Sequence, residues 1–301
     1  MELPITGHDP VLLREVLDHL LTGPDVTIVD CTLGRGGHAK EICSRLSLQA
    51  TFLGLDADPR NLEFAQSRLH GMPCPVRLFH ANFSELEDVL NHAGISHVDG
   101  ILADLGISTN QLFESEYGMS FSNPMPLDMR IDPRTPLSAA DIVNSYREDD
   151  LANVLYELAQ EHHSRRIARK IVEARRTSPI KTTDRLADLI RSAIPFRGGA
   201  PGKIDPATKS FMALRMKVND ELGNLERLLD VAPRRLKANG RFAVITFHST
   251  EDRMVKQAFR SAEQTGLLEI LTKKPLSPAD DELAVNPRSR SAKLRVAERS
   301  G

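Results

Sequence analysis

Short apolar runs alternate with amphipathic stretches along the first third of the chain. Four runs rich in β-branched and aliphatic residues, which we predict to be buried strands, cover residues 26–30, 51–56, 76–79 and 100–104. Between them, residues 40–46, 61–69 and 85–90 carry apolar side chains at helical spacing, with Asp58 and Ser84 as predicted N-caps. Strands that alternate with helices are typical of βαβ units, so this region predicts a parallel sheet with right-handed crossovers.

The pattern becomes purely helical after Asp104. Residues 151–160, 165–176 and 183–194 have helical periodicity, and no strand is predicted between about residues 112 and 215. A helix over 219–236 followed by Gly240, and a strand over 241–247, resume the α/β pattern, and apolar runs at 267–271 and 292–296 predict an edge hairpin. We therefore predict an α/β sheet domain, residues 1–111 and 216–301, interrupted by an all-helical domain, residues 112–215.

Composition narrows the class of protein. A hydrophobic fraction of 41% excludes a disordered chain, and no run approaches the ~18 apolar residues of a membrane span. The three cysteines are an odd number, and the first residues lack the basic and apolar regions of a signal peptide. We therefore expect a reduced, cytoplasmic setting. Because the formal net charge is only −2, any affinity for nucleic acid must come from local clusters of basic residues.

A glycine-rich turn follows the first predicted strand. Gly34, Gly36 and Ala39 satisfy the pattern G-x-G-x-x-A, and Asp56 ends the next strand at the expected spacing of about 20 residues, where an acid binds ribose hydroxyls. Asp30 directly precedes the turn and would repel a pyrophosphate, whereas it would attract the positive charges of S-adenosylmethionine. The charge favours S-adenosylmethionine, and a dinucleotide such as NAD stays an alternative.

Six motifs of this chain, in the same order, resemble those of the MraW/RsmH family of bacterial methyltransferases. They are His8–Leu13, Gly34–His38, Asp104–Ser108, Pro126–Arg130, Phe247–Arg253 and Asn286–Arg295. The resemblance implies a Rossmann-like class I methyltransferase sheet whose inserted helical domain recognises the substrate. It also implies an enzyme that uses S-adenosylmethionine to methylate N4 of a cytosine in the decoding region of small-subunit (16S) rRNA. The implied cofactor contacts are Gly36, Gly37, His38, Asp56, Phe83, Asp104 and Gln111.

Asp104, at the end of the fourth predicted strand, is the candidate catalytic residue. The exocyclic amine of cytosine is a weak nucleophile, so it needs positioning and an acceptor for its proton. Candidate substrate-binding residues are Phe121, Asp128, Arg130, Phe247, His248 and Ser249. Either phenylalanine would stack on a splayed-out cytosine, or would be a core residue. We expect no metal site, because no second ligand cluster accompanies His248, Glu251 and Asp252.

Basic residues gather in two segments. Residues 162–191 hold nine Lys or Arg against three acids, and residues 285–301 hold five against one. This predicts contact with phosphates. The resemblance implies small-subunit rRNA or an assembling small subunit as the partner, and we expect no membrane partner. The oligomeric state stays open between monomer and homodimer. The alternative functions are a catalytically silent RNA-binding or ribosome-assembly factor, which would not methylate, and an NAD-dependent oxidoreductase, which NAD would stabilise.

Overall fold

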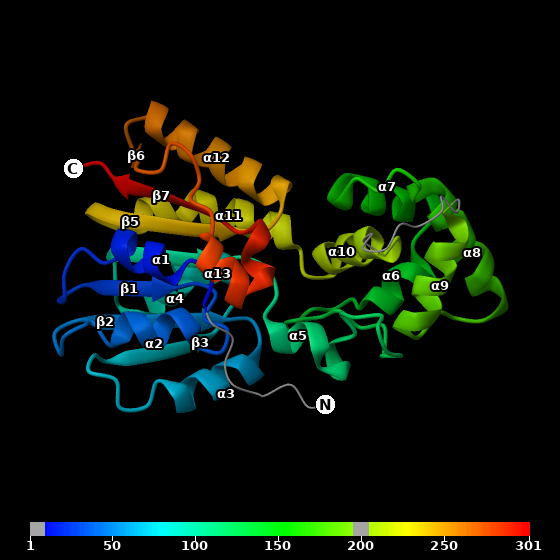
Figure 1. The fold of residues 1–301 in the computed structure, drawn as a ribbon, viewed down its shortest axis with the longest axis horizontal. Helices are drawn as coiled ribbons and strands as arrows, with labels where there is room; N and C mark the ends of the chain where they lie inside the picture. The colour runs from blue at the N-terminus through cyan, green and yellow to red at the C-terminus, as the bar shows by residue number, and fades with distance from the viewer. Residues whose placement is uncertain (1–9, 195–204) are drawn as a thin grey trace. The chain divides into compact units, whose positions relative to one another are not determined.

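Seven strands form one sheet in the order β3-β2-β1-β4-β5-β7-β6 (Figure 1). The computed structural model describes residues 10–194 and 205–301, so His8 and Asp9 of the first motif lie outside the described residues. The strands are β1 Thr27–Asp30, β2 Thr51–Asp56, β3 Val76–His80, β4 Val98–Asp104, β5 Leu236–Thr246, β6 Leu268–Ile270 and β7 Lys293–Arg299. The strands β1 to β5 pair in parallel, and β7 pairs antiparallel with both β5 and β6. The predicted α/β sheet is confirmed, and the strand order reverses between β1 and β4, where open sheets of this kind bind ligands.

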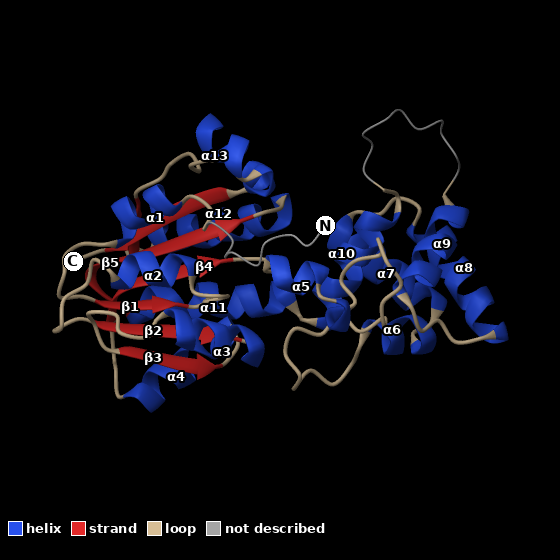
Figure 2. Cartoon of the chain, turned by 60° about the horizontal axis from the view of Figure 1, so that its bottom comes forward, coloured by secondary structure: helices blue, strands red, loops and turns tan. Residues whose placement is uncertain are grey.

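Helices cover both faces of this sheet, as Figure 2 shows. Successive strand residues alternate between two apolar cores: Ile28 and Leu102 belong to one, Val29 and Ile101 to the other. This period of two lets each strand bury both faces. The first core is covered by α1 Leu13–Leu20, α2 Gly37–Cys43 and α3 Pro59–Arg68, and the second by α4 Leu86–Ala93, α11 Glu221–Arg235 and α12 Ser249–Gln264.

Two predicted N-caps had different outcomes. The Asp58 cap is confirmed, because Arg60 N donates to Asp58 Oδ1 at 3.0 Å and proline opens α3. The prediction that Ser84 is an N-cap is wrong. Asn82 is the cap instead: its side chain accepts from Ser84 N at 3.0 Å, while Asn82 N donates to Glu85 Oε2 at 2.6 Å. This reciprocal pair begins the short helix η1 Phe83–Glu85 two residues before the predicted start.

The junction between α11 and β5 also differs from the prediction. Gly240 was expected to follow the end of the helix, yet α11 ends at Arg235 and β5 begins at Leu236. Gly240 lies inside β5, where the pairing with β4 shifts register between Val98 and Gly100. A Cβ atom at Gly240 would lie 2.9 Å from the carbonyl oxygen of Lys237. Position 240 therefore needs glycine because another part of the backbone approaches it closely where the strand pairing is irregular, and not because it caps a helix.

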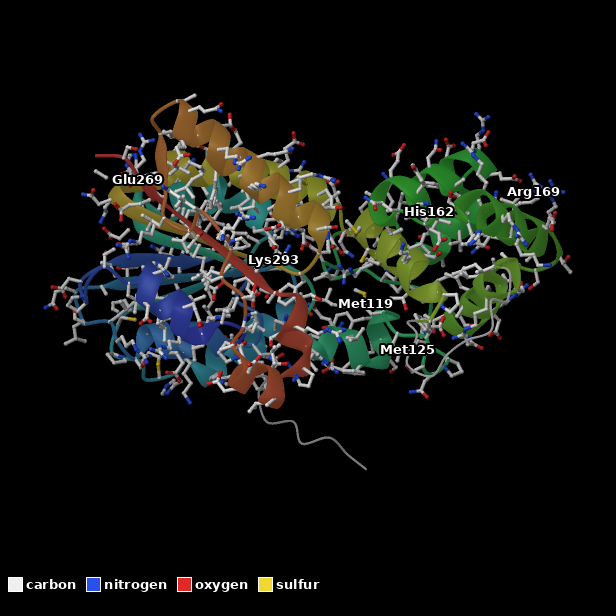
Figure 3. All side chains as sticks on the ribbon, turned by 45° about the horizontal axis from the view of Figure 1, so that its top comes forward. Met119, Met125, His162, Arg169, Glu269 and Lys293 are labelled. Carbon is white, nitrogen blue, oxygen red and sulfur yellow. The ribbon has the colours of Figure 1, made fainter. Side chains whose placement is uncertain are left out.

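The two C-terminal runs pair as β6 and β7, as predicted, but only β6 forms the edge of the sheet. β7 lies between β5 and β6 and is bonded on both sides. Glu269 marks β6 and Lys293 marks the start of β7 in Figure 3. The connection between the two strands contains α13 Asp280–Val285 and the short helix η3 Pro287–Ser291.

The chain divides into two compact units. Residues 1–106 and 222–301 form the first unit, and residues 107–221 form the second. Its elements are α5 Thr109–Phe113, η2 Ser115–Tyr117, α6 Ala139–Ser145, α7 Glu148–Ala159, α8 Ser164–Thr177, α9 Thr183–Ala193 and α10 Ala207–Val218. No strand occurs in its described residues. The unit is longer at both ends than the predicted insert of residues 112–215: Ile107 packs on its core, and Glu221 pairs with Arg215 at 2.7 Å. None of the described helices is long and apolar enough to cross a membrane.

Candidate active site

The glycine-rich turn connects β1 to α2 and is hydrogen-bonded to the last residue of β2. Gly34 and Gly36 adopt φ angles of +53° and +75°, which glycine reaches without strain. A Cβ atom at Gly36 would lie 3.5 Å from that of Ala65 on α3, so the turn packs closely against this helix. Gly34 N donates to Asp56 Oδ2 at 2.7 Å. Gly34 and Gly37, which are partly exposed, therefore present backbone without side chains at the carboxyl edge of the sheet.

Asp56 is held by backbone donors on both oxygens. In addition to the bond from Gly34, Asp58 N donates to Asp56 Oδ1 at 2.8 Å. Burial raises the pKa of Asp56 to about 6, although these hydrogen bonds oppose the shift. Oδ1 also accepts from Asn61 Nδ2 at 3.5 Å, whereas Oδ2 accepts only from Gly34 N among the described bonds and retains capacity for a hydroxyl group. The position and the remaining capacity suit the predicted contact with a ribose.

Thr32 connects the ends of β1 and β4. Asp104 N donates to Thr32 Oγ1 at 2.6 Å, and Thr32 N donates to Asp30 Oδ1 at 3.0 Å. Burial raises the pKa of Asp30 to about 7. Sequence reasoning missed Thr32, although a hydroxyl residue between a strand-ending acid and a glycine turn was a signal that could have found it.

One oxygen of Asp104 has no partner among the described residues. Oδ1 is buried and unbonded, whereas Oδ2 lies 3.7 Å from His38 Nδ1. Burial raises the pKa of Asp104 well above its usual value, and the charges of Asp30 and Glu251 add to the shift. A buried acceptor without a hydrogen bond is costly unless something binds it. Asp104 is therefore suited to bind a cationic or hydrogen-bond-donating group at the end of β4.

His38 is buried on α2 and is fixed by a backbone carbonyl. Its Nε2 atom lies 2.9 Å from the carbonyl oxygen of Val11. Because a carbonyl oxygen only accepts, Nε2 carries a proton and Nδ1 is the atom that faces Asp104. The structure thus brings together two of the predicted cofactor residues, and the role of Val11 was not evident from the sequence.

The remaining predicted cofactor residues lie in two different units. Phe83 opens η1 directly after β3 and packs partly buried against the second sheet core. Asp56 and Asp104 end β2 and β4, while Phe83 follows β3, and Gly36, Gly37 and His38 follow β1. Gln111 belongs to α5 of the unit 107–221, where its Oε1 accepts from Ser108 N at 3.0 Å. The predicted cofactor contact of Gln111 stays a prediction.

Phe247 and His248 connect β5 to α12, and Ser249 is the first residue of that helix. Phe247 N and His248 N donate to Glu251 Oε2 at 2.9 and 3.2 Å, and Glu251 N donates to His248 Nδ1 at 3.4 Å. His248 and Glu251 are therefore the capping box of α12, which begins at Ser249. The ring of Phe247 lies 3.6 Å from where a Cβ atom of Gly106 would stand. The predicted contacts of these residues with the substrate stay predictions.

The other substrate candidates have partners inside the unit 107–221. Phe121 meets Phe211 edge to face at 4.6 Å between ring centroids. Arg130 binds Asp128 through Nε and Nη2, at 2.7 and 2.8 Å. Partial burial raises the pKa of Asp128, but the hydrogen bonds and charge of Arg130 outweigh it and place the pKa below its usual value. This packing and pairing account for these three residues without a substrate.

Eight of the nine basic residues in segment 162–191 fall into two groups. Arg175 donates to the carbonyl oxygens of Val143 and Tyr146 at 2.7 and 2.6 Å, and so it stabilises the fold of its own unit. Arg185 and Arg191 are likewise bonded within this unit. The exposed side of α8, which we call the α8 face, carries Arg165, Arg166, Arg169, Lys170 and Arg176. Figure 3 shows Arg169 on α8 with its side chain directed outward.

Several basic side chains of the C-terminal segment form ion pairs or hydrogen bonds within the protein. Lys293 Nζ and Arg295 Nε lie 3.2 and 2.7 Å from the two oxygens of Asp252 on α12. Arg299 Nη1 lies 3.4 Å from the carbonyl oxygen of Leu267. These three side chains connect β7 to neighbouring segments. Of the two basic segments, segment 162–191 therefore has more exposed basic side chains, and those on α8 form the α8 face.

Comparison with known proteins shows the family. The model of the MraW methylase family matches residues 5–300. A relative from Clostridioides difficile (strain 630), named ribosomal RNA small subunit methyltransferase H, is 41% identical over 307 residues, which cover 97% of this chain and 98% of the relative. A relative of the same name from Acidobacterium capsulatum is 44% identical over 299 residues, with the same coverage.

One solved structure, an rRNA methylase from Streptococcus thermophilus, is 10% identical, covers 96% of this chain and 94% of its own, and has a TM-score of 0.41. At that score the overlap adds nothing to the description of the sheet. The sequence matches carry the assignment, because they extend over nearly the whole chain, sheet and helical unit alike. The chain therefore belongs to the MraW methylase family.

Proposed function

We propose that this protein is an S-adenosylmethionine-dependent methyltransferase that acts on the N4 amine of a cytosine in small-subunit rRNA. The observation that carries the proposal is the buried, unpartnered Oδ1 of Asp104, at the end of β4 and beside the glycine turn. The relatives named as small-subunit rRNA methyltransferases support the choice of substrate.

The residues at the carboxyl edge of the sheet fit the cofactor. S-adenosylmethionine supplies a methyl group on a positively charged sulfur. Asp56 would accept the ribose hydroxyls, and the exposed backbone of the glycine turn leaves room for the ligand. Asp30 and Asp104 provide negative charge for the cationic part, and binding a cation would favour their ionised forms.

Asp104 would also orient the amine of the substrate. A carboxylate oxygen without a partner can accept a hydrogen bond from the amine and then its proton as the methyl group is transferred. The raised pKa of Asp104 makes it a stronger proton acceptor than an ordinary carboxylate. His38 Nδ1 lies 3.7 Å from the second oxygen of Asp104.

The cysteines argue for the amine over ring carbon C5. Methylation of C5 requires a thiolate that adds to the ring. Cys31, Cys43 and Cys74 are all buried, and burial raises the pKa of each thiol. Mass spectrometry of nucleosides from methylated RNA should therefore yield N4-methylcytidine. A product of 5-methylcytidine, or no methylation at all, would exclude the proposed reaction, and stabilisation by NAD alone would favour an oxidoreductase.

Cofactor binding is expected to release protons near neutral pH. The pKa values of Asp30 and Asp56 are raised to about 7 and about 6, and the bound cation and hydroxyls favour the ionised carboxylates. Binding should lower both pKa values, so affinity should weaken as the pH falls below about 7, where Asp30 of the free protein takes up a proton, and further below about 6, where Asp56 does. Calorimetry at pH 6.5 in two buffers of different ionisation enthalpy measures the release. Identical heats in both buffers would contradict this assignment, and Asp30→Asn should reduce the difference.

The α8 face is expected to bind RNA. Replacing Arg166, Lys170 and Arg176 with glutamate should weaken binding to an rRNA fragment at least tenfold and reduce its dependence on salt, because each lost phosphate contact lowers the slope by about 0.7 for single strands. Arg165 and Arg169 are left unchanged because they lie 3.3 and 3.5 Å from acids of α7. Binding is measured by fluorescence anisotropy at several salt concentrations.

The matched control for the α8 face is reversal of three exposed cations elsewhere, Lys256, Arg260 and Lys273. It changes the net charge equally and should leave RNA affinity within about twofold, since distant exposed charges are screened. Equal losses in both triple variants would assign the effect to net charge and would refute the role of the α8 face.

A further inference from the structure

An open groove lies beside the glycine turn, on the side of α3 that faces solvent. It has a volume of about 720 Å³, and its lining residues are Arg35, Arg60, Glu63, Phe64, Ser67 and Arg68. Arg35 belongs to the glycine turn, and the other five belong to α3. We call this feature the α3 groove.

The groove concentrates arginines because of helical spacing. Arg60, Phe64 and Arg68 follow one another at intervals of four residues, so they share one face of α3. Arg35 joins them from the turn: its guanidinium carbon lies 4.9 Å from the centroid of the Phe64 ring, and its carbonyl oxygen accepts from Arg68 Nη1 at 3.4 Å. The sequence alone places Arg35 far from Arg68, and only the fold brings them together.

The charge of the groove is positive. Three guanidinium groups stand against one lining carboxylate, that of Glu63. Asp58 lies behind Arg60, with Oδ1 3.7 Å from Arg60 Nε, but that oxygen is buried and already accepts from the Arg60 backbone. The Arg60 side chain is 45% exposed, so it extends into solvent beyond this contact. The groove therefore attracts anions. A planar guanidinium group can donate two parallel hydrogen bonds to two oxygens of one phosphate.

We infer that the α3 groove binds the phosphodiester backbone of the RNA substrate, outside the nucleotide that is methylated. The inference rests on the proposed function. An extended groove lined by arginines suits successive phosphates of a strand, and the turn that carries Arg35 also carries Gly34, which donates to Asp56. Because Arg35 already covers the face of Phe64, the contact is to backbone phosphates and is independent of base identity.

The test is the double variant Arg60→Glu and Arg68→Glu. Affinity for an rRNA fragment should fall about tenfold at moderate salt, and the slope of log K against log salt should decrease by about 1.4 for two single-strand phosphate contacts. Affinity for S-adenosylmethionine should stay within about twofold: Arg68 loses only a bond to the carbonyl oxygen of Arg35, while the bonds of Gly34 N and Asp58 N to Asp56 and of Asp104 N to Thr32 are kept. Arg35 is left unchanged because it lies in the cofactor turn.

Two further variants keep the test decisive. Arg60→Gln with Arg68→Gln removes the charges without introducing repulsion and should give a smaller loss of the same kind, even if the double glutamate variant fails to fold. Lys256→Glu with Arg260→Glu, on the exposed side of α12, makes the same change in net charge and should leave RNA affinity unchanged.

Unchanged affinity and slope in the folded groove variants would overturn the inference, and so would an equal loss in the α12 control. Normal binding of naked RNA with weakened binding of the assembled subunit would also overturn it, since that result assigns the groove to an acidic protein. Failure of the unmodified protein to bind rRNA would instead refute the proposed function.

Discussion

Replacing Asp104 with asparagine is expected to lower the rate of methyl transfer at least about 100-fold, because a positioned proton acceptor contributes roughly 10²- to 10⁴-fold. The substitution keeps the shape of the side chain and removes its charge. The unpartnered Oδ1 would be lost as a proton acceptor at the end of β4. Single-turnover transfer to an rRNA fragment, with cofactor held at saturation, measures the chemical step directly.

The pH dependence of Asp104 gives a second readout. Because its pKa is raised in the folded protein, the transfer rate of the unmodified enzyme should rise with pH as Asp104 ionises, and this dependence should disappear in Asp104→Asn. His38→Asn should shift the profile with a smaller loss of rate, since His38 stands beside Asp104 without replacing it. If Asp104→Asn kept full single-turnover activity, the amine would have to be oriented by another group.

Replacing Asp56 with alanine is expected to weaken cofactor binding at least about 30-fold, which corresponds to about 2 kcal/mol for a charged acceptor of two hydroxyl groups. Part of the loss comes from the turn, because Gly34 N and Asp58 N would both lose their acceptor. Calorimetric titration with S-adenosylmethionine measures the affinity, and thermal unfolding without ligand measures the part due to the turn.

Asp56→Asn separates these two contributions, because its amide keeps one oxygen acceptor for the backbone but loses the charge. It should bind more tightly than the alanine variant and more weakly than the unmodified protein. The control is Asp18→Ala on the exposed side of α1, which should not change affinity. Unchanged cofactor affinity in Asp56→Ala would show that the cofactor binds elsewhere.

The fold was largely predictable because strand ends and helix faces leave local signals. Asp56 and Asp104 could be placed at one sheet edge from sequence alone, since carboxyl ends of parallel strands meet there. The hydrogen bond from Asp104 N to Thr32 Oγ1 could not, because it depends on the register between β1 and β4. Contacts between segments distant in sequence, such as His38 with Val11, leave no periodic pattern.

Charge counting was less informative than periodicity. Nine basic residues in one segment predicted contact with phosphates, whereas Arg175, Arg185 and Arg191 bond to groups of their own unit. Whether a cation is free for a partner depends on which side of its helix it occupies. The same reasoning explains why the α3 groove was overlooked: the spacing of Arg60 and Arg68 was visible, but Arg35 reaches them only through the packing of the glycine turn on α3.

The direct passage from α11 into β5 limits how the chain tolerates changes of length. Arg235 is the last helical residue and Leu236 the first of the strand, so no connecting residue can absorb an insertion or deletion. One added residue would either turn the helix by 100° or exchange the two faces of the strand. Phe247 and the capping box of α12 lie at the far end of that strand, so such an error would reach them through the whole length of β5. Evolutionary variation in length should therefore concentrate in other connections and avoid this junction.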